Sequence, residues 1–429
     1  MQKKPLKLNP VKAVFVEHFD ILWTKLFTSP VHLDSAISKA PPSMKAPLAE
    51  ITRVILQRPN SIAHYLGFRL SEGEPWGLTQ DELADWPTAR AMAERLFKTW
   101  KQDPDFKRGA KSFDTDFPPE LMHEWRGEYG HIIASNLARA LADDAPLSLR
   151  VTRQQPILDV LSSLNDSGVM DRDRAKLSKL SPVGITIASY AGVLQTEAHK
   201  NGWFEIQDEG SQIMSLFALW PSHFAKFLHK APGKFIPLEK GFELPTITSN
   251  FNVIDACAGA GGKSLAMADA LRGRGQVFSY DISERKLLSL RQRAKRAGVN
   301  NIKTVPVKPG EESVVVKKFL GKADLVLVDA PCSGWGVLRR NPDIKWRQDQ
   351  DTRERMPELQ FTILNNYAPL VKPGGRLVYG VCTFRKSETI NMVARFLEAN
   401  PEFKAGEGGF LGPHTSDGFF MQSFTRNPK

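Results

Sequence analysis

Cysteine is scarce in this sequence, with three among 429 residues. Cys257, Cys332 and Cys382 are widely spaced, so they cannot form a disulfide framework, and an odd number is typical of a reducing compartment. No C-x-x-C pair and no pair of neighbouring histidines offers a zinc ligand set. We therefore expect a protein that contains no disulfide and binds no metal.

Long apolar runs are also missing, because no segment approaches the roughly 18 consecutive apolar residues of a membrane span. The N-terminus, MQKKPLKLNPVKAVFVEHF, is basic but lacks the apolar core of about 7–15 residues that a signal peptide requires. Hydrophobic residues form 41% of the chain and charged residues 24%, which is ordinary for globular proteins. We expect a monomeric cytoplasmic protein that does not attach to a membrane.

Acidic residues are too few to balance the basic ones, since 58 Lys and Arg face 47 Asp and Glu, a formal net charge of +11. This balance favours polyanionic partners, nucleic acid first and an anionic membrane surface second. Many basic proteins bind neither, so charge alone leaves the partner open.

The sequence divides into three parts. Residues 1–145 are mostly helical by pattern: apolar residues recur at the helical period in VKAVFVEHFDILWTKLF, and proline clusters such as APPSMKAP separate such segments. Residues 146–205 form a small α+β module with expected strands at 147–152 and 181–189. Between these strands, QPILDVLSSLNDSGV predicts a helix that stops at Gly168.

Residues 206–429 alternate strands with helices. Each expected strand is a nearly continuous apolar run, as in strands buried on both faces. They are NVIDA (252–256), GQVFSYD (275–281), ADLVLVD (323–329) and GRLVYG (375–380). The alternation predicts a parallel, doubly wound α/β sheet.

A glycine-rich turn, VIDACAGAGGKS, follows the first of these strands and opens a helix. Glycines permit a tight turn and close approach of a ligand, and the helix N-terminus offers free N–H groups. Asp281 ends the next strand, where a carboxylate can accept hydrogen bonds from a ribose. The pattern favours a nucleotide-like ligand such as NAD, a flavin or S-adenosyl-L-methionine (SAM). A strand–helix connection without a ligand is the alternative. A Walker A loop is excluded, because its spacing needs glycine where Cys257 stands.

Two cysteines follow strand ends at the edge where ligands of such sheets bind. Cys332 lies in VDAPCSGWG, just after Asp329, and Cys382 lies in VYGVCTF. A single free cysteine is more often a buried apolar residue than a nucleophile. Two cysteines at strand ends, beside an acidic residue and a glycine turn, favour a catalytic role instead.

Several motifs together resemble those of one enzyme family. They are DACAGAGGKS, YDIS, VDAPCSGWGVLRRNPDIKWR and VYGVCTFRKSE, with QDEGSQ (207–212) and GPHTSDGFF (412–420) at the flanks. The series is similar to that of the SAM-dependent RNA (cytosine-5)-methyltransferases of the RsmB/Nop2/Sun family, over about residues 147–429. DAPCSG with a later strand-end Cys-Thr distinguishes this family from DNA cytosine methyltransferases, which generally use only the first thiol.

The resemblance implies a fold and a domain order. Residues 206–429 would be an α/β, doubly wound, Rossmann-like class I methyltransferase domain. A small α+β RNA-recognition-like module (146–205) and an N-terminal helical region (1–145) would precede it. The module lacks the aromatic signature of a standard RNA-recognition motif.

The resemblance also assigns roles to residues. It implies that Cys382 is the nucleophile and that Cys332 helps to release the product. Asp329 and Lys263 would support the charge that develops on the cytosine. SAM would lie on the glycine turn with Asp281 on its ribose and Asp329 at the same pocket. The turn comprises Cys257, Ala258, Gly259, Ala260, Gly261, Gly262 and Lys263.

Basic stretches suit an RNA partner, because cations neutralise phosphates and aromatic rings stack on unpaired bases. One stretch contains Arg285, Lys286, Arg291, Arg293, Lys295, Arg296 and Lys303. A second contains Arg339, Arg340, Lys345 and Arg347 with Trp335 and Trp346. A solvated basic helix face explains the first stretch nearly as well. Arg385 and Lys386 are candidates, by sequence proximity alone, for cations that favour a thiolate at Cys382.

The sequence departs from the family pattern in places. The third-strand region, KTVPVKPGEES (303–313), has no aspartate near the adenine position, which falls near Lys308, and Glu388-Thr389 stands where the family has Glu-Asn. We predict an RNA cytosine-5 methyltransferase that acts on ribosomal RNA, with transfer RNA as the alternative substrate. A non-catalytic RNA-binding assembly factor on this fold is a second alternative. A nicotinamide oxidoreductase is a third, in which the paired cysteines have no evident role.

Overall fold

The computed structural model describes residues 10–29, 32–66, 83–84, 87–99, 116–152, 155–167, 175–188, 192–233, 236–237, 242–247, 249–308, 317–347, 350–413 and 416–428. Contacts within the chain define two compact units. The first contains Met1–Asp144 and Val337–Asp349, and the second contains Ala145–Gly336 and Gln350–Lys429. The three parts expected from the sequence differ from these two units in two ways. The expected parts 146–205 and 206–429 lie in one unit, and residues 337–349, expected in the last part, lie in the first unit.

The first unit is helical, as the apolar periodicity predicted. Its helices are α1 (Pro10–Thr28), α2 (Leu33–Ile37), α3 (Pro42–Gln57), α4 (Pro59–Tyr65), α6 (Pro87–Thr99), α7 (Pro119–Tyr129), α8 (His131–Ala142) and α16 (Ile344–Arg347). Proline begins several of them, and its fixed φ suits the first helical turn, where its missing N–H costs nothing. The apolar faces of α1, α3 and α6 form the core, which also buries Trp346.

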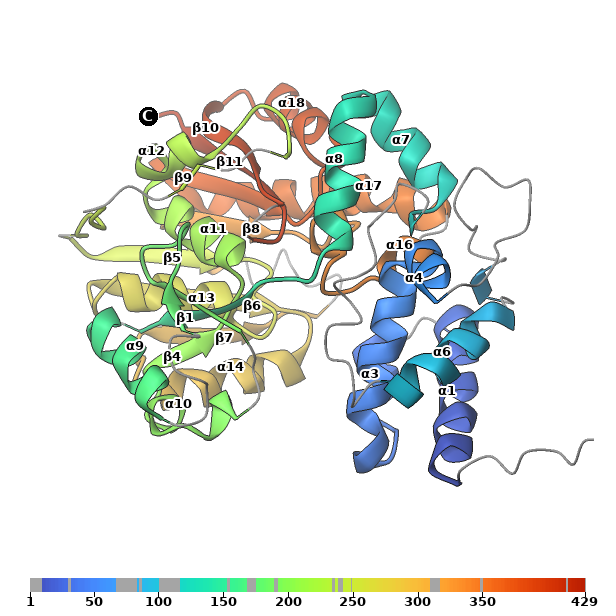
Figure 1. The fold of residues 1–429 in the computed structure, drawn as a ribbon. Coiled ribbons are helices and arrows are strands. Elements are labelled where there is room, and N and C mark those ends of the chain that lie inside the picture. Colours follow the sequence, from blue (N-terminus) through green and yellow to red (C-terminus); the bar gives the residue numbers. More distant parts are fainter. Residues whose placement is uncertain are drawn as a thin grey trace, which may run out of the picture. The chain divides into compact units, whose positions relative to one another are not determined.

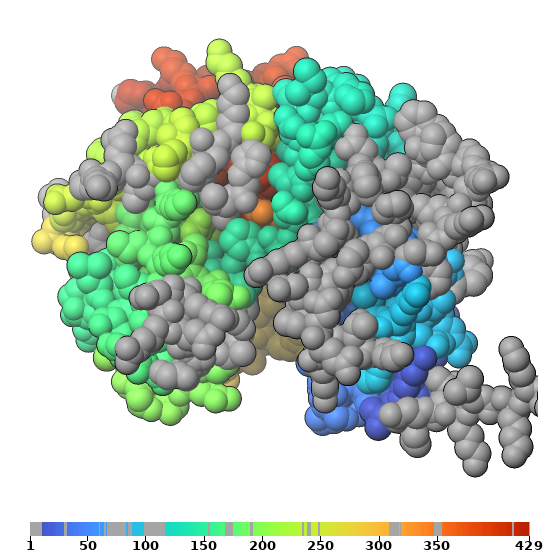
Figure 2. Space-filling view, in the orientation of Figure 1, coloured from blue at the N-terminus to red at the C-terminus, as the bar shows by residue number. Residues whose placement is uncertain are grey.

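The second unit begins with a small antiparallel sheet, drawn in green in Figure 1. Its strands are β1 (Leu147–Val151), β2 (Lys176–Leu177), β3 (Gly184–Ile187) and β4 (Phe204–Ile206), in the order β2-β3-β1-β4. Helices α9 (Ile157–Asp166) and α10 (Glu197–Lys200) pack on it, and their green atoms form the lower left of the face in Figure 2. The expected strands and helix are present, whereas Gly168 lies outside the described residues.

A seven-stranded sheet forms the rest of this unit, in the order β10-β11-β9-β8-β5-β6-β7. The strands are β5 (Phe251–Asp255), β6 (Gly275–Asp281), β7 (Ile302–Pro306), β8 (Ala323–Asp329), β9 (Val371–Val381), β10 (Phe403–Leu411) and β11 (Phe419–Arg426). β5 to β9 pair in parallel, and β11 pairs antiparallel with both β9 and β10. The predicted parallel sheet is confirmed, and the antiparallel strands β10 and β11 are an addition to it.

Helices cover both faces of this sheet (Figure 1). The helices are α11 (Glu209–Leu219), α12 (Pro221–Phe224), α13 (Gly262–Ala270), α14 (Glu284–Arg296), α17 (Gln350–Tyr367) and α18 (Ile390–Ala399). Successive strand residues point to opposite faces. Val378 accordingly packs in the core of α11 and α13, whereas the next residue, Tyr379, donates a hydrogen bond to Gln360 on α17. The ring contact of Tyr280 with Tyr367 lies on the α17 face as well.

Candidate active site

The glycine turn lies between the end of β5 and the start of α13. Gly259 and Gly261 have φ values of 56° and 85°, in the left-handed region that favours glycine. A Cβ at Gly261 would come within 2.1 Å of Leu290 Cδ1 on α14, so only glycine lets the turn lie on that helix. A Cβ at Gly259 would meet no atom within 4 Å. The turn is therefore closed on the α14 side and open at Gly259.

Asp281 ends β6 next to this turn. Its Oδ2 accepts a hydrogen bond from the Gly259 N–H at 2.7 Å, and its Oδ1 accepts one from the Ser283 N–H at 2.7 Å. A carboxylate has about four acceptor positions, so both oxygens retain capacity for ribose hydroxyls. The structure thus brings Asp281 to the glycine turn, which the spacing in the sequence suggested.

Asp255 is buried beneath the turn and was not among the predicted site residues. Its Oδ2 accepts a hydrogen bond from Ser264 Oγ at 2.6 Å. Burial raises the pKa of Asp255 to about 7, although the bond from Ser264 opposes this shift. Its Oδ1 has no hydrogen-bond partner among the described residues. Buried acceptors are normally satisfied, so the turn and this oxygen fit SAM, which has an ammonium group and ribose hydroxyls to donate.

Lys263, the last residue of the turn motif, reaches the end of β8. Its Nζ lies 2.6 Å from Asp329 Oδ2, and their side chains are 13% and 26% exposed. Burial disfavours the ammonium, but the Asp329 carboxylate outweighs it and raises the pKa of Lys263. Cys382 is among the groups that interact electrostatically with Lys263 and raise its pKa, so the ammonium lies near that sulfur.

The two strand-end thiols are neighbours. Cys332 follows β8, Cys382 follows β9, and their sulfur atoms are 3.3 Å apart. Hydrogen bonding to Cys382 and burial together raise the pKa of Cys332 well above its ordinary value. Either sulfur atom can be the donor in this contact. Burial and nearby carboxylates likewise raise the pKa of Cys257, which suits a structural thiol.

A buried polar network holds the two thiol loops together. Glu388 Oε2 accepts the Ser333 N–H at 2.9 Å and the Gln360 Nε2 donor at 2.8 Å. The same Gln360 nitrogen donates to the carbonyl oxygen of Pro331 at 2.8 Å. Ser333 Oγ also lies 2.6 Å from Thr383 Oγ1. The sequence pointed to Glu388 only as part of a departure from the family pattern. Gln360 was not predicted, and the only sign of its role is that it is a polar residue on the buried face of α17.

Part of the predicted RNA-binding stretch is buried. Trp335 and Trp346 are each 1% exposed, and Arg339 and Lys345 are 4% and 7% exposed. Lys345 Nζ donates to the main-chain oxygens of Gln57 and Asp116 within the first unit. The assignment of these four side chains to RNA was wrong, because alternating cations and aromatic rings form the same pattern in a buried segment as on a surface. The side chain of Arg347 lies outside the described residues.

The basic face of α14 divides into two groups. Arg293 and Arg296 both pair with the buried carboxylate of Glu205 on β4, so they are not part of a solvated cationic face. Arg285, Lys286 and Lys295 on the same helix, and Lys303 on β7, remain candidates for phosphate contacts. Near Cys382, the Arg385 guanidinium lies over the Trp335 ring at 5.9 Å.

The described residues contain neither a metal-binding cluster nor a membrane-spanning helix. No group of three His, Cys, Asp or Glu side chains there is arranged to hold a metal ion. No helix in the described ranges is both long enough and apolar enough to span a membrane.

Known proteins resemble this chain in sequence and in fold. Residues 246–424 match the family described as 16S rRNA methyltransferase RsmB/F. The protein named "Probable ribosomal RNA small subunit methyltransferase B" of Bacillus subtilis (strain 168) is 31% identical over 300 residues, which cover 68% of this chain and 58% of that protein. Ribosomal RNA small subunit methyltransferase B of Klebsiella pneumoniae subsp. pneumoniae is 29% identical over 313 residues, covering 70% and 63%. The chain thus spans less than two thirds of the length of these two relatives.

Two solved structures share the fold. PH0851 has a TM-score of 0.67 at 20% identity and covers 98% of this chain and 100% of its own. NSun6 from Pyrococcus horikoshii, solved with SFG, has a TM-score of 0.58 at 16% identity and covers 73% of this chain and 99% of its own.

The sheet order, the glycine turn after β5 and the acid at the end of β6 are those of the class I methyltransferase fold. By sequence, residues 246–424 belong to the RsmB/F (Nop2/Sun) family.

Proposed function

We propose that this protein transfers the methyl group of SAM to carbon 5 of a cytidine in ribosomal RNA. The observation that supports this most is the pair of thiols, with sulfur atoms 3.3 Å apart, beside the Lys263–Asp329 ion pair. A single buried thiol has a structural explanation, but a thiol pair near a cation and a carboxylate at the ligand edge of the sheet has a chemical one.

Carbon 5 of cytosine is too weak a nucleophile to accept a methyl group unaided. The Cys382 thiolate adds to carbon 6, and the electron pair of the ring double bond makes carbon 5 nucleophilic. SAM supplies the methyl group when bound. Loss of the proton from carbon 5 to solvent leaves an electron pair that re-forms the ring double bond and expels the Cys382 thiolate from carbon 6, which restores the aromatic ring and frees the enzyme.

Each of the other side chains has a role in this scheme. Asp329 and Lys263 contact the N3–N4 edge of the cytosine and stabilise charge as the thiolate adds. A cation near Cys382 suits a nucleophilic sulfur, and we assign this part to Lys263. We assign to Cys332, whose pKa is raised, the donation of a proton toward the Cys382 sulfur as it leaves carbon 6, since the contact between the thiols admits either donor. Residues Cys257–Lys263 hold the cofactor with Asp281 at its ribose, and Asp329 lies at the same pocket.

The names of the relatives support ribosomal RNA as the substrate class, and the formal charge of +11 suits any RNA. The cytosine has to leave its stack to reach two partly buried thiols, so an unpaired or easily extruded cytidine is the expected target. We assign RNA recognition to the module at residues 146–205 and to Arg285, Lys286 and Lys295 of α14, whereas Arg293 and Arg296 pair with Glu205.

A methylation assay on unmodified total RNA with radiolabelled SAM tests the proposal. The wild-type chain is compared with Cys382→Ala and Cys332→Ala, and products are separated on denaturing gels. We expect Cys382→Ala to transfer no label and Cys332→Ala to accumulate a protein–RNA adduct that survives denaturation. The trapped RNA then distinguishes ribosomal from transfer RNA. Absence of label with wild type, and no difference between the variants, would favour an RNA-binding assembly factor instead.

A further inference from the structure

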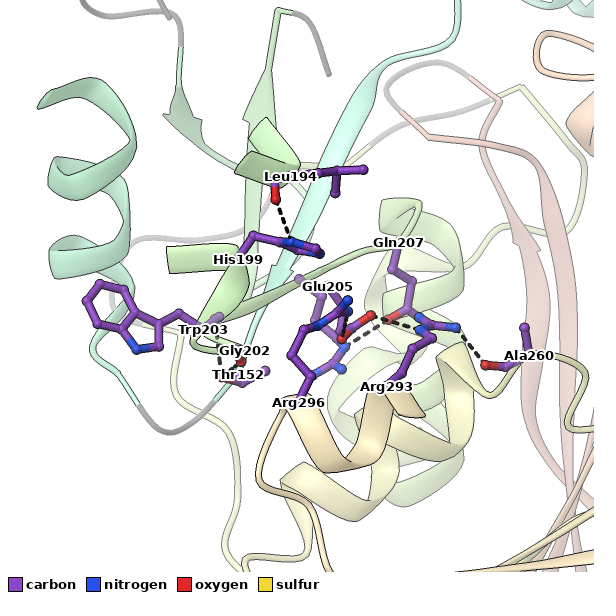
Figure 3. Close-up of polar contacts among 11 residues, drawn as sticks. Thr152, Leu194, His199, Gly202, Trp203, Glu205, Gln207, Ala260, Arg293 and Arg296 are labelled. Carbon is purple, nitrogen blue, oxygen red and sulfur yellow. Dashed lines mark hydrogen bonds and ion pairs between the residues drawn. The ribbon is translucent and has the colours of Figure 1, made fainter. Parts of the chain in front are cut away.

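The small module at residues 146–205 is joined to the cofactor turn through helix α14. Glu205 on β4 is 2% exposed, and two arginines of α14 surround its carboxylate (Figure 3). A buried carboxylate is costly unless it is paired, so this cluster fixes the module against the helix. The packing is close: a Cβ at Gly202, just before β4, would come within 2.0 Å of the Arg296 carbonyl oxygen.

Arg293 connects this cluster to the turn. Its Nε donates to Glu205 Oε2 at 2.9 Å, and its NH1 donates to the carbonyl oxygen of Ala260 at 2.6 Å (Figure 3). The guanidinium is planar and rigid, so the orientation that Glu205 imposes on Nε also sets the position of NH1. Ala260 stands between the two left-handed glycines of the turn. The Gly259 N–H donates to Asp281 and the Gly261 N–H donates to the Ala258 carbonyl oxygen, and Arg293 adds a bond to the Ala260 carbonyl between them.

A second link runs through β1 to the helix that follows the turn. Arg150 is buried, and it donates to Gln207 Oε1 at 2.8 Å and to Asp269 Oδ2 on α13 at 3.2 Å. Helix α13 begins at Gly262, directly after the turn. The module therefore restrains both the turn and the helix that extends from it.

We propose that Arg293, oriented by Glu205, is a positioning residue for the cofactor turn, so that the RNA-recognition module helps to set the affinity for SAM. This deepens the proposed function and rests on it for the identity of the ligand. Neither residue touches the reacting atoms. Arg293 acts by holding the Ala260 carbonyl, and with it the N–H groups of the turn, in one arrangement.

Helix α14 provides matched controls. Arg296 pairs with Glu205 but its bonds in the structure do not include the turn, and Arg291 donates to Thr304 Oγ1 on β7 instead. We would measure the affinity for S-adenosylhomocysteine by calorimetry, without RNA, in full-length Arg293→Ala, Arg296→Ala and Arg291→Ala. Arg293→Ala should weaken binding about five- to tenfold, the scale of one partly exposed charge-assisted hydrogen bond. Arg296→Ala and Arg291→Ala should stay within about twofold of wild type, since neither removes a bond to the turn.

Hydrogen exchange of residues 257–263 in the ligand-free chain supplies an independent result. We expect faster exchange of residues 257–263 in Arg293→Ala than in Arg296→Ala. The two variants are compared at equal global stability, judged by their urea midpoints, or after the rates are corrected for any difference in stability. Equal affinities and equal exchange in these two variants would overturn the positioning role. If wild type bound no S-adenosylhomocysteine, the proposed function would fail, while the exchange comparison would still decide whether Arg293 positions the turn.

Discussion

Lys263 is mostly buried and Lys345 is buried, yet their surroundings act on the ammonium group in opposite directions. Lys263 contacts the Asp329 carboxylate, which overcomes burial and raises its pKa. Lys345 donates to two main-chain oxygens, and burial lowers its pKa to about 7 although Asp116 opposes the shift. Carbonyl oxygens satisfy the hydrogen bonds of an amine without supplying the charge that keeps it protonated. The partner therefore decides whether a buried lysine remains a cation that chemistry can use.

Removing the carboxylate of the first pair should have the largest effect. Asp329→Asn leaves Lys263 buried beside an amide and removes the charge that we assign to the cytosine edge. We expect kcat/KM for RNA methylation to fall roughly 100- to 1,000-fold, as when one preorganised electrostatic partner is lost. Glu358→Gln is the control, because it also removes a carboxylate from an ion pair, but this pair, with Arg395, is exposed and joins α17 to α18. Less than a threefold loss in Asp329→Asn would contradict the role of this carboxylate.

Removing the cation of the same pair should cost somewhat less. Lys263→Met leaves Asp329 in place but takes the positive charge away from Cys382, so we expect a loss of roughly 10- to 100-fold in the same assay. Lys263→Arg keeps the positive charge on a group of another shape, so it should retain part of the activity that Lys263→Met loses. If Lys263→Met and Lys263→Arg are equally active, the charge of this residue has no part in the reaction.

For Lys345 the comparison predicts an effect of pH on stability. Its pKa is about 7 in the folded chain against an ordinary 10.5, so between these values the unfolded chain binds a proton that the folded chain does not. The free energy of unfolding should then rise with pH by up to about 1.4 kcal/mol per unit. Lys345→Met should lack this rise from pH 7.5 to 9.5 in urea unfolding. Parallel curves for the variant and the wild type would show that Lys345 is charged when folded.

An exposed pair gives the smallest expected effect. Lys200 and Glu197 are three residues apart on α10, with their Nζ and Oε1 atoms 2.6 Å apart and side chains 58% and 75% exposed. Lys200→Ala should change the free energy of unfolding by about 0.2–0.5 kcal/mol. Repeating the urea titration in about 1 M salt should remove the difference, since the Debye length there is about 3 Å. A difference that persists in about 1 M salt would mean that the charges of this pair are not its cause.

The predictable features were those that depend on local pattern. Four strands of the large sheet, the glycine turn and the edge position of both thiols follow from apolar runs and from where such runs end. The predicted helices of residues 1–145 within the described ranges follow from the 3.6-residue period.

The features that could not be predicted depend on distant partners. Glu205 pairs with Arg293, 88 residues away, and no local sequence pattern around either residue predicts this pairing. Whether Trp346 is exposed or buried likewise depends on Leu56, whose carbonyl oxygen accepts its indole N–H 290 positions earlier in the chain. The roles of Cys382 and Cys332 in catalysis remain predictions.

The position of β11 has a consequence for how the protein is made. This strand lies between β9 and β10, and just before it the Gly418 N–H donates to Gly336, whose own N–H donates to the carbonyl oxygen of Cys382. A ribosome must therefore translate beyond residue 418 before the loop of Cys382 acquires these neighbours, and through residue 425 before β9 is fully paired with β11. At about 5–20 residues per second, residues 146–205 are translated roughly ten seconds or more earlier. The nascent chain thus contains the module that we assign to RNA recognition before the loop of the proposed nucleophile is in place.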